Sequence, residues 1–257
     1  MNKLKFLWVS IFLLIWEIIA KLNIVNPLLF PSLENILKAL IEDLFNGSLL
    51  AQIGFTLRLI FIAIVISIII SIIMSFLSTK SKFFSSLVET LILILHPLPG
   101  IALFPILIAF IGINEQSIII VIVHSVLWPL VLNLTTAYKL CPEMYLKIAD
   151  NFELSLFQKL IKVYFPYGIP YFISGLKIGY ARAFRAIISA EMVFGAVSSY
   201  GGLGYYIFTK RVFMNTAGMY AGLIVIIIIG ILIEDVVFKQ LEKHTFGKWG
   251  TYEHIGN

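Results

Sequence analysis

The chain has 257 residues, of which 60% are apolar and 13% are charged, and its mean hydropathy is +0.99. A soluble domain of this size carries about 25% charged and about 45–50% apolar residues, so the composition excludes an ordinary cytoplasmic enzyme, a disordered protein and a secreted disulfide scaffold. The net charge of +5 comes in short basic groups between apolar runs, which is typical of membrane-protein loops and not of a nucleic-acid-binding face.

The N-terminal part of the chain predicts one membrane helix followed by one surface helix. The apolar run that follows Met1–Lys5 begins like a signal peptide, but no small-residue cleavage site comes after it. We therefore expect an uncleaved first helix over about residues 6–22. Prolines at 27 and 31 then break the chain, and apolar residues recur at helical spacing over 33–45. This pattern predicts an amphipathic helix on the periplasmic side, ended by Asn46-Gly47-Ser48.

Long runs with few charged residues predict the other spans, because a bilayer core takes about 20 apolar residues per helix. Together with the first helix they give six expected spans, at about 6–22, 58–79, 86–112, 116–138, 168–194 and 218–240. The predicted fold class is therefore an all-α membrane protein, a polytopic bundle of about six transmembrane helices that forms a single domain over 1–257.

The distribution of basic residues predicts the orientation of this multi-pass bundle. With the N-terminus inside, eleven loop Lys and Arg residues lie on the inner side and five on the outer side. Both termini are therefore expected in the cytoplasm. The connection over 139–166 becomes the only long cytoplasmic loop.

Two of the expected spans contain residues that are unusual at membrane depth. Pro97, Pro99 and Pro105 interrupt the third span, which favours either a kinked structural helix or a broken helix beside an aqueous pathway. In the fifth span, Arg182, Arg185 and Glu191 fall within one half of the helix. They form either a structural ion pair between Arg185 and Glu191 or a basic surface that attracts an anion along a pathway. Lys177, nearer the cytoplasmic end, is expected to reach the interface.

The cytoplasmic loop also allows two interpretations. Charged residues alternate with Phe152, Leu156 and Phe157, and Pro142 and Glu143 suit the start of a helix. Composition alone favours a helical hairpin that rests on the membrane surface. The functional alternative is a docking site, where the aromatic and aliphatic side chains enter a groove on a soluble partner.

The loop resembles the EAA loop of binding-protein-dependent ABC importer permeases. That motif reads Glu-Ala-Ala, three residues, Gly, and a Pro thirteen residues after the Gly. Counting back from Pro166 places Lys147-Ile148-Ala149 on the Glu-Ala-Ala and Glu153 on the Gly. A glutamate adopts positive φ only at a cost, so we expect the turn at Glu153 to differ from that of the family. We also expect the glutamate at this position to restrict the partner to an ATPase that carries a complementary basic group.

The resemblance extends over nearly the whole chain, to the nitrate/sulfonate/taurine group of permeases. It is carried by Pro97-Leu98-Pro99, by Leu103-Phe104-Pro105, by Arg182-Ala183-Phe184-Arg185, by Ala190-Glu191-Met192 and by Gly202-Leu203-Gly204-Tyr205. It implies a type I ABC importer permease fold in a bacterial inner membrane. The implied coupling residues are Lys147, Ala149, Phe152, Glu153, Ser155, Leu156, Phe157 and Pro166. The candidate translocation-pathway residues are Pro97, Pro99, Pro105, Arg182, Arg185, Glu191, Gly202 and Gly204.

The same resemblance implies the partners: two ATPase subunits that hold ATP and Mg²⁺, a second permease copy, an extracytoplasmic solute-binding protein and membrane lipids. The resemblance implies a small solute of the sulfonate, nitrate, taurine or thiamine-precursor kind, and two Arg residues in the fifth span favour an anionic one. The chain contains no Gly-x-x-x-x-Gly-Lys-Ser/Thr sequence, and with the single Cys141 it offers no disulfide and no cysteine metal cluster. We expect no catalytic residue, no metal and no cofactor in this chain. A self-sufficient channel or secondary transporter, and an intramembrane hydrolase, are the alternatives.

Overall fold

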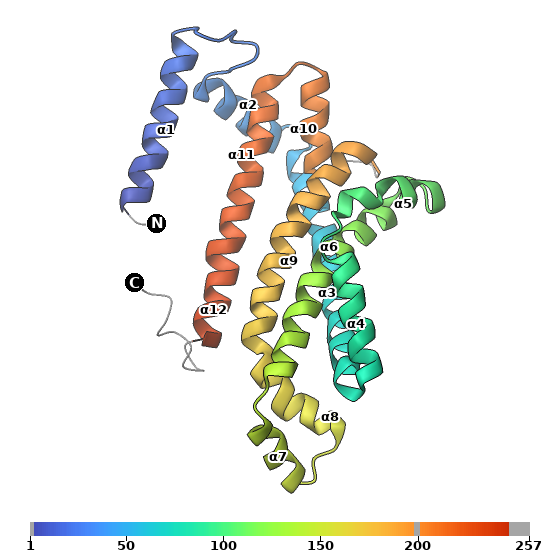
Figure 1. Ribbon diagram of the computed structural model, residues 1–257. Coiled ribbons are helices and arrows are strands. Elements are labelled where there is room, and N and C mark those ends of the chain that lie inside the picture. The colour runs from blue at the N-terminus through green and yellow to red at the C-terminus, as the bar shows by residue number, and fades with distance from the viewer. Residues whose placement is uncertain (1–2, 198–200, 247–257) are drawn as a thin grey trace. The chain divides into compact units, whose positions relative to one another are not determined.

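The structure, a computed structural model, describes residues 3–197 and 201–246, and every regular element in these ranges is a helix (Figure 1). This confirms the all-α fold class. Lipid imposes it, because a helix satisfies all of its backbone hydrogen bonds within its own segment. The chain divides into two compact units, Met1–Leu57 with Glu191–Ile229 and Arg58–Ala190 with Gly230–Asn257.

The first unit contains the amphipathic helix that the sequence predicts. Its complete helices are α1 (Lys3–Lys21), α2 (Leu33–Phe45) and α10 (Leu203–Val212), and it shares α3 (Leu49–Lys80), α9 (Phe165–Phe194) and α11 (Thr216–Leu232) with the second unit. The Ser32 side chain caps α2 by accepting a hydrogen bond from the Asn35 N–H, and Asn46 ends the helix. Both bounds of the predicted helix over 33–45 are therefore confirmed.

The second unit is built around α6 (Glu115–Leu140), whose most apolar stretch is 67% buried. Gly175 and Gly179 of α9 lie one turn apart against the α6 backbone, so that a Cβ at Gly179 would lie 3.1 Å from the Val126 carbonyl oxygen. Small residues at this spacing let two membrane helices approach closely. The other helices of this unit are α4 (Lys82–Leu95), a 3-10 turn (Gly100–Leu103), α5 (Phe104–Phe110), α7 (Glu143–Asn151), α8 (Leu156–Lys159), π-helices over Leu160–Tyr164 and Ile233–Phe238, and α12 (Lys239–Phe246).

Three helical stretches in the described ranges have the length and composition of membrane spans: Leu49–Lys80, Glu115–Leu140 and Thr216–Thr245. A fourth span arises if α4 and the segment Gly100–Phe110, which are bent by 91° at the proline break, count as one. The first of these helices begins nine residues before the span expected at 58. Helices α1 and α9, which lie where the first and fifth spans are expected, carry charged residues, and six spans stay a prediction.

Candidate functional site

The expected coupling loop folds into two short helices, α7 and α8, which lie together at one end of α6 and α9 (Figure 1). Pro142 is the N-cap of α7, and Glu143 in the first turn pairs with Lys147 at 3.4 Å. Ala149 is buried, whereas Lys147 lies on the exposed side of the helix. The loop thus has a defined buried face and a defined outer face.

Glu153 forms the turn that ends α7, with φ of 53° in the left-handed region. Its N–H donates to the Asp150 carbonyl at 2.9 Å, and the next N–H, of Leu154, donates to the Ala149 carbonyl at 3.0 Å. These two bonds make a Schellman motif, whose left-handed position is usually glycine because glycine has no Cβ to clash. Our expectation of a different turn was wrong, because Glu153 adopts the conformation that a glycine would occupy without strain.

The second half of the loop is fixed by side-chain caps and an ion pair. Ser155 and Gln158 form a reciprocal capping box at the start of α8, which satisfies two N–H groups that a helix start leaves free. Lys159 forms an ion pair with Asp150 across the turn. A π-helix over Leu160–Tyr164 then leads into α9, where Pro166 is the second residue and lies in the first turn, a position that tolerates proline.

Three large apolar side chains project from this rigid loop into solvent. Phe152 is 75% exposed, Leu156 61% and Phe157 66%. Clustered exposed apolar residues of this size mark interaction sites on proteins. The arrangement fits the docking interpretation of the loop, and it fits a hairpin that rests on the membrane surface as well.

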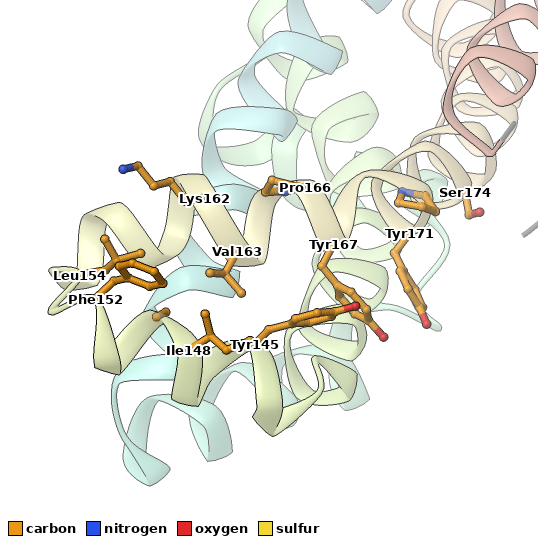
Figure 2. A pocket seen from close by; sticks show the side chains of 12 residues that line it. Tyr145, Ile148, Phe152, Leu154, Lys162, Val163, Pro166, Tyr167, Tyr171 and Ser174 are labelled. Carbon is orange, nitrogen blue, oxygen red and sulfur yellow. The ribbon is translucent and has the colours of Figure 1, made fainter. Parts of the chain in front are cut away.

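A cavity of about 700 Å³ lies between α7 and the start of α9 (Figure 2). The Tyr145, Tyr167 and Tyr171 hydroxyls gather at one end of it, and Phe152 and Leu154 lie at the other. The Tyr167 hydroxyl donates to the Leu140 carbonyl at 3.1 Å, which ties α9 to the end of α6. Sequence reasoning missed this cavity, although tyrosines at 167 and 171 and prolines at 166 and 170 repeat at the spacing of one helical turn.

The proline break in the third expected span is stabilised from α9. The chain turns by 91° between α4 and the segment Gly100–Phe110, across Pro97 and Pro99, and Pro105 lies in the first turn of α5. The Arg182 guanidinium donates to the His96 carbonyl at 3.2 Å, at the end of α4. A neighbouring helix thus supplies a donor where the prolines have removed backbone donors.

Glu191 lies in a buried cluster of its own and does not pair with Arg185. One carboxylate oxygen accepts from the Thr56 hydroxyl at 2.8 Å, and the other accepts from the Gly204 N–H at 2.9 Å. The Thr56 hydroxyl in turn accepts from the Leu203 N–H at 2.9 Å. The carboxylate therefore caps the N-terminus of α10, where the helix dipole favours negative charge. No side chain of the same cluster carries positive charge.

The structure brings together three of the expected pathway residues in one cluster, and it places Arg182 beside the proline break. Gly202 packs so closely on Glu191 that a Cβ would lie 2.0 Å from a carboxylate oxygen. Glu191, Gly202 and Gly204 therefore form one cluster, to which Thr56 belongs although no sequence pattern pointed to it. Arg185 is exposed, and none of the ion pairs in the described ranges includes it. An Arg185–Glu191 ion pair was the wrong alternative.

Lys177, which we expect to reach the membrane interface, has an ammonium that is paired within the protein. It lies 3.2 Å from the Glu242 carboxylate and 3.7 Å from the Glu234 carboxylate, and so links α9 to the last helical segment. In the part of the chain that the structure describes, no group of His, Cys, Asp and Glu side chains has the composition to hold a metal ion.

A polar cluster that the sequence did not suggest joins α2 to α10. The Tyr206 hydroxyl donates to an Asp43 carboxylate oxygen at 2.6 Å, and the Lys210 ammonium approaches the same oxygen to 2.6 Å. Burial, followed by the hydrogen bond to Asp43, raises the pKa of Tyr206 above its ordinary value. The cluster fixes the predicted amphipathic helix to the segment that follows Glu191.

Comparison with known proteins finds similarity to membrane permeases of transport systems. Residues 67–247 match the family described as the inner membrane component of binding-protein-dependent transport systems. A putative ABC transporter permease of Methanocaldococcus jannaschii is 28% identical over 86% of this chain and 82% of its own length. A nitrate import permease of Synechocystis is 30% identical over 62% of this chain and 56% of its own length. The taurine transport permease of Escherichia coli is 23% identical over 88% of this chain and 82% of its own length.

Proposed function

Because the chain belongs to the family of inner membrane components of binding-protein-dependent transport systems, we propose that it forms the translocation pathway for a small anionic solute. It is an ABC importer permease of the nitrate, sulfonate and taurine type. A solute-binding protein outside the membrane delivers the solute. Two copies of the chain line the pathway, and both termini lie in the cytoplasm.

The observation that carries this proposal is the docking loop. Its exposed Phe152, Leu156 and Phe157 side chains enter a groove on each of two ATPase subunits, which hold the ATP and Mg²⁺. The Schellman turn, the capping box of Ser155 and the ion pair of Asp150 with Lys159 make the loop rigid. A rigid loop passes a movement of the ATPase to α6 and α9, between which it is inserted.

The side chains of α9 and of the proline break support an anionic solute. Arg185 is exposed on α9, and a planar guanidinium suits the oxygens of nitrate, sulfonate or carboxylate groups. Arg182 holds the bend at Pro97 and Pro99, and through it the shape of the pathway. Glu191, Gly202 and Gly204 fix the start of α10 on the outer side and act as part of the gate.

The test is a pulldown of the tagged chain from its native membrane in mild detergent, with mass spectrometry of what is recovered. We expect an ATPase in about equal amount, together with a solute-binding protein. The double variant Phe152→Ala, Phe157→Ala should lose the ATPase. The matched control Phe110→Ala, an 86% exposed phenylalanine outside the loop, should retain it. Recovery of the wild-type chain alone, stable and homogeneous, contradicts the proposal.

A further inference from the structure

Glu153 occupies the turn that ends α7, between Phe152 and Leu154. Phe152 and Leu154 line one end of the cavity between α7 and α9 (Figure 2). The Glu153 side chain is exposed. Because the Schellman hydrogen bonds fix the backbone on both sides, the point from which the Glu153 side chain projects is fixed on the outer surface of the loop.

The Schellman hydrogen bonds hold the Glu153 backbone in the left-handed conformation, whereas its carboxylate has no partner in the described ranges. A non-glycine residue at φ of 53° carries a steric penalty that glycine avoids. No hydrogen bond or ion pair in the described ranges involves the Glu153 carboxylate, and the two lysines nearest in sequence are engaged elsewhere, Lys147 with Glu143 and Lys159 with Asp150. A strained residue without an internal contact points to a function outside the chain.

We propose that the Glu153 carboxylate binds an arginine or lysine side chain of the ATPase subunit, at the rim of the groove that receives Phe152. This inference rests on the proposed function and names the chemistry of the partner. A charge at the rim of an apolar contact selects among partners more than it adds affinity, because a wrong partner would leave the charge unpaired or face it with like charge. The pair therefore restricts docking to an ATPase with a basic residue at that place.

The experiment separates the charge of Glu153 from its backbone conformation. The affinity of the permease for the ATPase recovered with the wild-type chain is measured in detergent for Glu153→Gln, Glu153→Gly and Glu153→Lys. Gln removes the charge and keeps the strain, whereas Gly removes both. We expect both to weaken binding roughly fivefold, the effect of one exposed charge pair. Lys should weaken it further, and added salt should bring the affinity of the wild type down toward that of Glu153→Gln.

The outcomes are distinguishable. Glu143→Gln is the matched control, because this exposed carboxylate of the same loop already has an internal partner, and its affinity should change less than twofold. The thermal stability of the Gly variant without ATPase should equal or exceed that of the wild type, which shows that its fold is intact. If Gln and Gly bind the ATPase as tightly as the wild type, the inference is overturned. If no ATPase accompanies the wild type, the proposed function itself fails.

Discussion

Replacing Gly202 with alanine is expected to break the capping cluster of α10. The added methyl group would lie 2.0 Å from one carboxylate oxygen of Glu191 and 2.1 Å from its Cδ, so the carboxylate has to move. Glu191 is fully buried, and its position is set by hydrogen bonds from Thr56 at 2.8 Å and from the Gly204 N–H at 2.9 Å. A displaced carboxylate loses both of these bonds.

The expected loss follows from those two contacts. A hydrogen bond to a charged group contributes about 1.5–3 kcal/mol, so the loss of two amounts to about 3–6 kcal/mol. For a chain of this size a loss of 3 kcal/mol lowers the unfolding midpoint by roughly 6–12 °C. Thermal unfolding of the purified protein in detergent, followed by intrinsic tryptophan fluorescence, measures the shift.

The control uses a glycine of the same unit that has free space around it. Gly54 lies within α3, and a Cβ there would contact no other atom within 4 Å, so Gly54→Ala should be neutral or stabilise by about 0.5–1 kcal/mol. Adding Glu191→Ala to Gly202→Ala removes the clash, and the second change should therefore cost less in the double variant than in the wild type. An unfolding midpoint of Gly202→Ala within 2 °C of the wild type would refute this reasoning.

Three further predictions concern Arg182, Arg185 and Tyr206. Arg182→Met should lower stability by about 1–3 kcal/mol in thermal unfolding, because it leaves the His96 carbonyl without its donor; a change no larger than that of Arg182→Lys would contradict this role. Arg185→Ala should reduce solute uptake by cells while the ATPase still copurifies; normal uptake would exclude the residue from the pathway. Since the pKa of Tyr206 is raised in the folded protein, its contribution to stability is full below about pH 10 and is lost as the pH rises further. Tyr206→Phe should therefore flatten the fall of the unfolding midpoint above pH 10, and an unchanged slope would argue against it.

In the docking loop, the sequence pattern predicted the position of the loop but not the backbone conformation of its turn. The spacing to Pro166 located the loop, and the exposed Phe152, Leu156 and Phe157 agree with the docking interpretation. The conformation at Glu153 was predicted wrongly, because intrinsic preference argues against positive φ in a glutamate. The Schellman hydrogen bonds override that preference.

The sequence by itself determined the helices and their interruptions. Apolar runs must be helical in lipid because no water satisfies their backbone groups. Ser32 sets the start of α2, and Pro97 and Pro99 break the helix after α4. These are local effects, which neighbouring residues decide.

Only the tertiary structure decided which charged and polar groups meet. Thr56 lies 135 residues from Glu191, and His96 lies 86 residues from Arg182. A buried carboxylate or a freed carbonyl needs a donor, and the sequence shows that need without showing its source. Packing brings distant helices together and so supplies the donors, which is why Glu191 caps α10 and leaves Arg185 exposed.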